Sequence, residues 1–500
     1  MHTKEKRPNI LLITADQMRW DALGCMGNSI IQTPTLDALA KRGILFRNGF
    51  TPNPICVPAR AAIMTGNMPQ VCTGHKTNTG RIRDGQPLLT ETLKSVGYRT
   101  YALGKLHFVP YSPPNEPRLV HGFEHVEWTE SGRIIGQFDQ HGEGEGIEDY
   151  FDYLKQVGYL GYTRAHGIGN NDVRPCRTPL PQEHTVDHWV ADRTLRQLDL
   201  HRREFADRPF FIWMSSPKPH SPYDPPDPYD KLYDPRSIPP PFGGESMLEQ
   251  KNPYIEYSRH HHGQESLSPQ ARQVIKAYYY GCITWMDKMI GRVIERLEQQ
   301  GILDETLILF TADHGDLMGD FGTWFKCNHL NGSVRVPFIA TGPGIKPGTV
   351  NDALVGLEDI LPTFAAAAGA EIGQPVQGHD LTPIFRNPAT SVRDVYYSST
   401  LDGDKSSAMV CDGRWKYIYS AGNATEELYD EIADPGEIEN LAISPKHEQR
   451  REEMRQKLIE QAIALQDNSL VPDGQLVRAE VDRKKLRSER IAPVLGWRWY

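Results

Sequence analysis

The stretch ETLILFTADHG (305–315) is a run of apolar residues that ends in the charged pair Asp313 and His314. A run of this length, closed by a polar cluster, is typical of a buried strand. Similar runs recur along the chain with helical patterns between them. The runs cover 9–15, 44–50, 98–105, 208–216 and 336–344, and the helical patterns cover 34–42, 90–96 and 268–300. This alternation predicts an α/β fold with a mostly parallel central sheet flanked by helices.

Four of these predicted strands are followed directly by side chains suited to metal binding or proton transfer. They are Asp16, Lys105 with His107, the segment 215–220 with His220, and Asp313 with His314. In open parallel sheets, ligand sites gather at the carboxyl ends of the strands. We therefore expect these side chains to share one site.

The character of the sequence changes beyond about residue 385. The segments 392–400 and 408–420 resemble short antiparallel strands, and a charged helix is expected over about 445–466. We predict a catalytic domain over 1–385 and a smaller C-terminal α+β subdomain with a tail over 386–500. The basic and aromatic tail favours a homo-oligomer, and the glycine-rich segment 137–181 is a candidate substrate-facing lid.

Composition excludes several classes of protein. Of the 500 residues, 39% are hydrophobic, and the net charge of −9 argues against nucleic-acid binding. No run of about 18 apolar residues predicts a membrane span. The N-terminus lacks the shape of a signal peptide, so a cytoplasmic location is expected. The seven cysteines are dispersed without a C-x-x-C pair, which predicts free thiols.

Asp16, Gln17, Asp313 and His314 form a set of candidate ligands that is rich in oxygen. Carboxylate and amide oxygens suit hard divalent cations such as Ca²⁺ or Mg²⁺. A structural role is the alternative, since Asp313 could instead cap the turn in DHGD. We favour the metal site because two of the aspartates follow predicted parallel strands.

Cys56 precedes Pro58, a residue suited to a first helical turn, and Arg60 follows within that turn. The N-terminus of a helix stabilises anions. Further cationic or hydrogen-bonding groups are available from Lys105, His107, His220 and Lys326. Together with a divalent cation, this set describes a site for a tetrahedral oxyanion, either sulfate or phosphate.

The segment CVPARAAIMTG (56–66) matches the C-x-P-x-R-x-x-x-x-T-G signature, and the chain resembles the type I sulfatases of the alkaline phosphatase superfamily. Other segments that carry the resemblance are TADQ, GKLH (104–107), KPHSP (218–222), ADHGD (312–316) and WFK (324–326). Within this family, the quoted segments most resemble the choline-sulfatase-like and arylsulfatase branch. The resemblance implies an alkaline-phosphatase-like fold and a sulfuric ester hydrolase.

The resemblance also implies a role for each matched residue. Cys56 would be oxidised to formylglycine by a formylglycine-generating enzyme, and the gem-diol of that residue would attack the sulfur of a metal-bound sulfate monoester. Asp16, Gln17, Asp313 and His314 match the metal ligands, usually of Ca²⁺, with Mg²⁺ or Mn²⁺ as alternatives. The remaining matches are Arg60 for holding the formylglycine hydrate, Lys105 and Lys326 for gripping sulfate, His107 as the base that helps to eliminate sulfate, and His220 as the acid that protonates the leaving oxygen.

Two positions depart from the family pattern. Ala59 replaces the usual serine of C-x-P-S-R, and Gln17 replaces a metal-binding aspartate of many members, which leaves the identity of the metal open. One alternative is a phosphonate monoester or phosphodiester hydrolase on the same fold; Lys105 and His107 favour the sulfatase. Another is an inactive protein that binds sulfated ligands. Aryl sulfates, choline sulfate and sugar sulfates all remain possible substrates.

Overall fold

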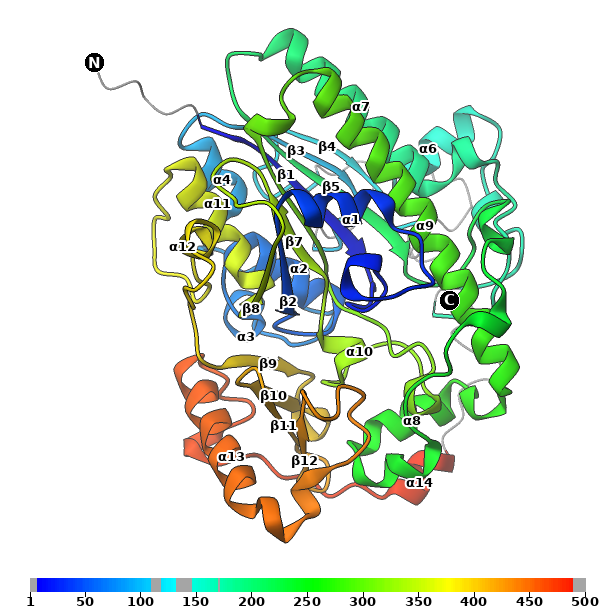
Figure 1. Cartoon of the computed structure of the whole chain (residues 1–500), viewed down its shortest axis with the longest axis vertical. Coiled ribbons are helices and arrows are strands. Elements are labelled where there is room, and N and C mark those ends of the chain that lie inside the picture. The colour runs from blue at the N-terminus through cyan, green and yellow to red at the C-terminus, as the bar shows by residue number, and fades with distance from the viewer. Residues whose placement is uncertain (1–6, 109–117, 132–145, 170, 489–500) are drawn as a thin grey trace.

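The computed structural model describes residues 7–108, 118–131, 146–169 and 171–488. Within them, a large sheet has the strand order β4-β3-β5-β1-β6-β7-β2-β8, and helices cover both of its faces (Figure 1). Its strands are β1 (Asn9–Asp16), β2 (Ile44–Phe50), β3 (Arg99–Gly104), β4 (His125–Trp128), β5 (Phe210–Pro219), β6 (Thr306–Ala312), β7 (Phe338–Thr341) and β8 (Thr349–Gly356). The predicted α/β fold is confirmed.

The direction of the strands places the site. Only β7 runs antiparallel to its neighbours β6 and β2, and the other neighbouring pairs in this sheet are parallel. The four strands whose ends carry the candidate residues are adjacent, in the order β3-β5-β1-β6. Their carboxyl ends therefore meet at one edge of the sheet, as the sequence predicts.

The helices form a layer on each face of the sheet. The long helices α7 and α9 pack on β5, and α1 packs beside them, whereas α2, α4 and α11 gather on the other face (Figure 1). The longer helices of the large domain are α1 (Pro34–Arg42), α2 (Cys56–Thr65), α6 (Asp149–Gln156), α7 (Val186–Glu204), α8 (Pro253–His261), α9 (Pro269–Gln299) and α11 (Ile360–Ala368). Shorter ones are α3 (Pro69–Cys72), α4 (Leu89–Lys94), α10 (Asn331–Val334) and α12 (Thr382–Arg386).

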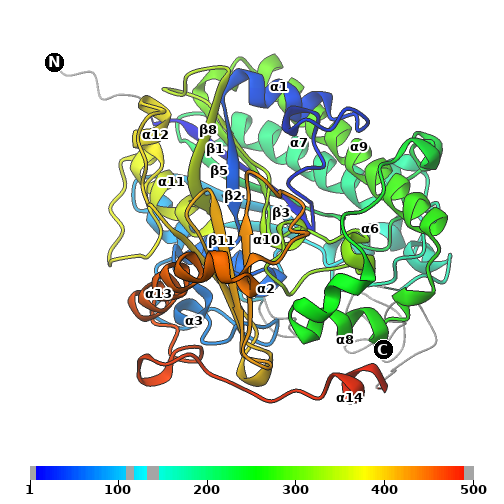
Figure 2. The same cartoon turned by 60° about the horizontal axis from the view of Figure 1, so that its bottom comes forward.

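A second, antiparallel sheet follows in the order β12-β11-β10-β9. Helix α13 (Glu448–Ala464) packs against it, and α14 (Arg483–Ser488) lies beside α8 (Figure 2). The strands are β9 (Tyr396–Thr400), β10 (Ser407–Cys411), β11 (Trp415–Ser420) and β12 (Thr425–Asp430). The expected C-terminal α+β region is present, and the domain boundary at 385 stays a prediction.

Gly104 brings the ends of β3 and β5 together. Its φ of +106° lies in the region that glycine adopts readily, and a Cβ atom there would lie 2.0 Å from the carbonyl oxygen of Ser215. The backbone N–H of Lys105 donates to that same oxygen at 2.8 Å. The glycine therefore allows the chain to turn out of the sheet immediately before Lys105 and His107.

Several other expectations have outcomes. All seven cysteines are free thiols, as predicted. Among the described residues, no helix combines the length and the apolar character that crossing a membrane requires. Of the lid candidate 137–181, residues 137–145 and 170 lie outside the described residues, and the rest includes α6. The aromatic end of the tail also lies outside them.

Candidate active site

The centre of the site is a buried cluster of four side chains: Asp16, Cys56, Asp313 and His314. One potential ligand atom from each lies within 4.8 Å of the others. The Cys56 Sγ atom is 3.1 Å from His314 Nε2 and 3.8 Å from Asp16 Oδ1. Residues separated by more than 250 positions in the chain thus meet at one point.

Cys56 is the first residue of α2, as expected from Pro58, and it is 1% exposed. No side chain caps the helix at Ile55, but the N–H of Val57 donates to Asn78 Oδ1 at 3.1 Å. This bond gives Asn78 a structural role at the start of the helix. The Cys56 side chain therefore stands at the positive end of α2, a place that favours an anion.

Two ammonium groups flank the thiol. Lys105 pairs with Asp16 through its Nζ atom, while Lys326 Nζ lies 3.4 Å from Cys56 Sγ and 2.6 Å from Gln17 Oε1. Burial alone would raise the pKa of the Cys56 thiol, but the charges of Lys105 and Lys326 outweigh it and hold the pKa well below its usual value. The charges around Sγ therefore stabilise a negative charge at that position.

Arg60 ties the cluster to the ends of two strands. Its Nε donates to Asp313 Oδ2 at 2.8 Å, and its Nη1 donates to the Lys105 carbonyl at 2.7 Å and to Ser215 Oγ at 2.9 Å. The side chain is fully buried. Its Nη2 atom has no hydrogen-bond partner among the described residues, which leaves one donor for a ligand.

Gln17 directs its side-chain oxygen Oε1 toward Lys326, whose ammonium group also contacts Cys56. Its Nε2 donates to the buried carboxylate of Asp316, so the amide is oriented with Oε1 toward Lys326. The backbone N–H of Gln17 donates to Asp313 Oδ1 at 3.0 Å, and its φ is +66°. Tyr279 donates from its hydroxyl to the Gln17 carbonyl at 2.8 Å. Gln17 is thus fixed from both its backbone and its side chain.

These donors fit a hard divalent cation. Two carboxylates, an amide oxygen and one imidazole converge, and oxygen-rich sets of this kind suit Ca²⁺ or Mg²⁺. The His314 Nδ1 atom lies 3.0 Å from the Gly315 carbonyl, a contact that leaves Nε2 facing Cys56 and the carboxylates. The carboxylate of Asp316 lies behind Gln17 and supplies negative charge close to the position where Gln17 lacks it.

His107 follows β3 and His220 follows β5, two neighbouring strands on one side of the central pair β1 and β6. His107, three residues after β3, donates from its backbone N–H to Glu130 Oε1 at 2.8 Å. His220 follows Pro219, the residue of β5 that pairs with Asp16 in the sheet. The His220 Nδ1 atom lies 2.9 Å from the Ser221 carbonyl.

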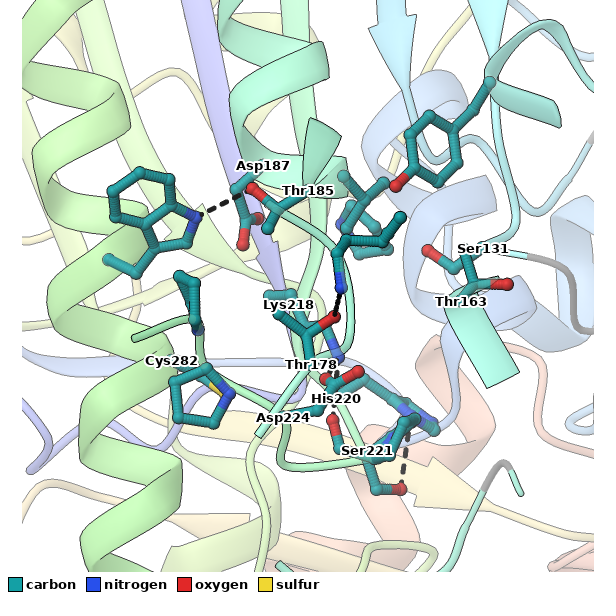
Figure 3. A pocket seen from close by; sticks show the side chains of 18 residues that line it. Ser131, Thr163, Thr178, Thr185, Asp187, Lys218, His220, Ser221, Asp224 and Cys282 are labelled. Carbon is teal, nitrogen blue, oxygen red and sulfur yellow. Dashed lines mark hydrogen bonds and ion pairs between the residues drawn. The ribbon is translucent and has the colours of Figure 1, made fainter. Parts of the chain in front are cut away.

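A small pocket of about 40 Å³ adjoins His220. Figure 3 shows the hydroxyl groups of Ser131 and Thr163 on one side of it, with Thr178, Lys218 and His220 grouped at its centre. The Lys218 ammonium pairs with Asp224 and also donates to the Pro222 carbonyl at 2.7 Å. This ion pair closes the loop that carries His220.

The sequence points to most of these residues but not to the residues that hold them in place through hydrogen bonds. Asp316 lies within the quoted ADHGD segment, so its presence was visible, but its bond to Gln17 joins residues 299 positions apart. Ser215 begins the segment 215–220 that the sequence marks as a strand end, whereas Tyr279 and Glu130 carry no motif that marks them. Only the fold brings them to the site.

Comparison with known proteins agrees with this geometry. The model of the sulfatase family matches residues 8–370, and a model described as the C-terminal part of N-sulphoglucosamine sulphohydrolase matches residues 319–464.

The chain is 31% identical to an arylsulfatase of Clostridium perfringens (strain 13 / Type A), over 91% of this chain and 94% of that one. It is 30% identical to a choline-sulfatase of Rhizobium meliloti (strain 1021), over 88% and 83%. The crystal structure of a phosphonate monoester hydrolase of Agrobacterium radiobacter shares the fold, with a TM-score of 0.78 at 24% identity over 95% of this chain and 100% of that one. With a family model matched over most of its length, and relatives at this level of identity, the chain belongs to the sulfatase family.

Proposed function

We propose that this protein hydrolyses a sulfate monoester with a nucleophile made from Cys56. The observation that carries the proposal is the position of Cys56 at the N-terminus of α2, among two carboxylates, an imidazole and two ammonium groups. A formylglycine-generating enzyme would convert the thiol to the aldehyde, whose hydrate supplies the attacking hydroxyl. Cys56 Sγ marks the place where that hydroxyl would stand.

The cationic side chains would bind the sulfate group. Lys105 and Lys326 both act on Cys56 and would bind the sulfate oxygens, while the unpartnered Nη2 of Arg60 is a donor for the formylglycine hydrate. Fixed charges of this kind stabilise the negative charge that develops in the transition state.

Asp16, Gln17, Asp313 and His314 would hold one divalent cation, and Ca²⁺ suits their oxygen-rich set best. A cation bound there would polarise the sulfate and favour ionisation of the nucleophile. The protein's own contribution is to fix the ligands: Asp313 Oδ1 accepts from the backbone N–H groups of Gln17 and His314, both at 3.0 Å.

His220 would donate a proton to the leaving oxygen, and His107 would accept a proton when sulfate is released. They follow β5 and β3, which are neighbours on the same side of the central pair β1 and β6, so both approach the centre from that side. The pocket beside His220 is the place we assign to part of the leaving group.

A sulfate ester is preferred over a phosphonate ester because Lys105 and His107 supply a cation and a base after β3. The similarity to named sulfatases at 30–31% identity supports the same choice. We further propose that residues 1–385 form the catalytic domain and that 386–500 complete it. The leaving group is an aryl group, choline or a sugar, and an assay with one substrate of each kind identifies it.

The test begins with the full chain produced together with a formylglycine-generating enzyme. The mass of the peptide that contains Cys56 should show the loss of sulfur and the gain of an aldehyde. The matured protein is then assayed with 4-nitrophenyl sulfate, choline sulfate, N-acetylglucosamine-6-sulfate and a phenylphosphonate ester, with Cys56→Ala as the control. Turnover of a sulfate that Cys56→Ala lacks supports the proposal. An unmodified Cys56, or turnover of the phosphonate ester alone, would overturn it.

A further inference from the structure

Glu130 is a fully buried carboxylate beside the proposed base His107. The two residues come from neighbouring parallel strands: Gly104 of β3 pairs with Trp128 of β4, and the N–H of Thr129 continues the ladder to the Gly104 carbonyl at 3.2 Å. Glu130 and His107 therefore leave the sheet side by side. Their proximity is set by the fold and not by flexible surface loops.

One oxygen of Glu130 is committed to two N–H donors. Oε1 accepts from the backbone N–H of His107 at 2.8 Å and from the indole Nε1 of Trp128 at 3.1 Å. This pair of bonds fixes the plane of the carboxylate and determines the direction in which its other oxygen points.

The other oxygen faces the His107 ring. Oε2 lies 3.9 Å from His107 Nδ1, and both atoms are buried without a hydrogen-bond partner among the described residues. Two buried polar atoms that both lack partners cost free energy, so an approach of about 1 Å that joins them in a hydrogen bond is favourable. Catalytic hydrogen bonds often tighten only when the ligand binds.

We propose that Glu130 is a positioning residue that keeps a proton on Nδ1 of His107. An ionised carboxylate can only accept, so the Nδ1 atom opposite Oε2 must carry the hydrogen. The Nε2 atom of the neutral ring then holds the free lone pair and can take a proton from the hydroxyl at position 56. The inference rests on the proposed function for the role of His107, but the tautomer itself can be measured without any turnover.

Glu130→Gln is a sharp test because the site dictates how the amide must sit. The carbonyl oxygen of the glutamine has to face the two N–H donors of His107 and Trp128, which leaves its NH₂ group facing Nδ1. An NH₂ group is a donor, so Nδ1 becomes the acceptor and the hydrogen moves to Nε2. The ring would then hold a proton at the atom that should accept one.

The experiment uses the matured full-length chain labelled with ¹⁵N-histidine, with the His107 signals identified by their loss in His107→Gln. Long-range ¹H–¹⁵N spectra should show the hydrogen on Nδ1 in the wild type and on Nε2 in Glu130→Gln. With a sulfate ester that the wild type hydrolyses, the kcat of Glu130→Gln should be lower by about 100-fold or more, while its KM changes by less than about threefold. Glu130→Asp, which keeps the charge, should recover part of the lost kcat.

Glu148→Gln is the matched control. Glu148 is also a fully buried carboxylate, and it accepts from Thr129 Oγ1 and from the backbone N–H of Glu130 rather than from His107. We expect its kcat to stay within about threefold of the wild type, since a large loss of kcat requires a group that acts on the proposed base. The mass of the position-56 peptide in each variant confirms equal maturation.

A wild-type hydrogen on Nε2, an unchanged tautomer in Glu130→Gln, or equal losses of kcat in Glu130→Gln and Glu148→Gln would each overturn the inference. If Glu130→Gln fails to fold, the wild-type tautomer and the kcat of Glu130→Asp decide. If the matured chain hydrolyses no sulfate ester, the proposed function fails, whereas the tautomer still decides the role of Glu130.

Discussion

The side-chain amide of Gln17 donates to the carboxylate of Asp316, and this bond determines that the amide oxygen faces Lys326 beside Cys56. Asp316 is itself held by the backbone N–H groups of Met318 and Phe325 on Oδ1, and by the Tyr223 hydroxyl on Oδ2. Hydrogen bonds within the protein therefore set its orientation. Asp316 lies outside the cluster of Asp16, Cys56, Asp313 and His314, yet it orients Gln17, one of the proposed metal ligands.

Asp316→Asn should weaken cation binding by about 10- to 100-fold. The asparagine carbonyl has to face the backbone N–H groups of Met318 and Phe325, so the asparagine NH₂ group faces Gln17. The Gln17 amide then has to turn, and its own NH₂ group takes the place of Oε1 beside Lys326. Titration of metal-free protein with CaCl₂ in a calorimeter measures the change. Asp287→Asn, another buried aspartate that accepts two backbone N–H bonds at the start of α1, should bind Ca²⁺ like the wild type. Equal affinity in Asp316→Asn would contradict the prediction.

Arg60→Lys should destabilise the fold despite keeping the charge. Lysine cannot serve Asp313, the Lys105 carbonyl and Ser215 at once, so buried acceptors lose donors at a cost of about 2–3 kcal/mol. Urea unfolding monitored by tryptophan fluorescence measures the loss. Arg42→Lys, in an exposed ion pair with Asp304, should stay within about 0.5 kcal/mol of the wild type. The prediction is wrong if the two variants unfold alike.

Gly104→Ala and Gly97→Ala separate steric clash from backbone strain. Both glycines have similar φ values, +106° and +99°, but a Cβ atom at 104 would lie 2.0 Å from the Ser215 carbonyl oxygen, whereas one at 97 would have no atom within 4 Å. We expect a cost of about 1–2 kcal/mol at 97 and clearly more at 104. Thermal unfolding of the two variants measures the difference. A Tm for Gly104→Ala equal to that of Gly97→Ala would rule out the close approach.

The stability of the protein should fall as pH rises from about 4 to about 6, in part through Asp187. Burial raises the pKa of Asp187 to about 6, although the Ser216 hydroxyl donates to it. The folded state therefore holds a proton that the unfolded state releases across this window, and loss of that proton costs up to about 3 kcal/mol. Asp187→Asn has no such proton to lose.

Unfolding in urea at pH 4.5 and pH 7.5 tests this dependence. The loss of unfolding free energy between the two pH values should be smaller in Asp187→Asn than in the wild type. Asp207→Asn, at an exposed position outside this buried network, should show the wild-type loss. Parallel pH dependences in all three proteins would refute the assignment to Asp187.

The elements that sequence predicts well are those with a strong apolar signal. β6 is fully buried and β1 is buried except at Asn9, and α9 begins and ends within one residue of the expected 268–300. β4 was missed because its four residues HVEW are mostly half-exposed, and β8 because Asn351 and Asp352 interrupt its apolar pattern. Both strands lie at the edges of the sheet, where burial no longer imposes a pattern.

The candidate site divides in the same way. The sequence could name Cys56, Arg60, Asp313 and His314 because they lie in a motif or at the end of a clear strand. It could not predict that Asp316 orients Gln17 or that Glu130 faces His107, since these contacts depend on which strands become neighbours. A side chain that acts by orienting another can be recognised only in the folded structure.

The burial of Cys56 has a consequence for the order of events during synthesis. With 1% of its surface exposed, the thiol is out of reach of any other enzyme once the sheet has formed. Asp313 and His314, which close the cluster, are made 257 residues after Cys56 (313 − 56). At about 5–20 residues per second, the ribosome takes roughly 13 to 50 s to add them. The proposed oxidation of Cys56 therefore has to take place before β6 joins the sheet.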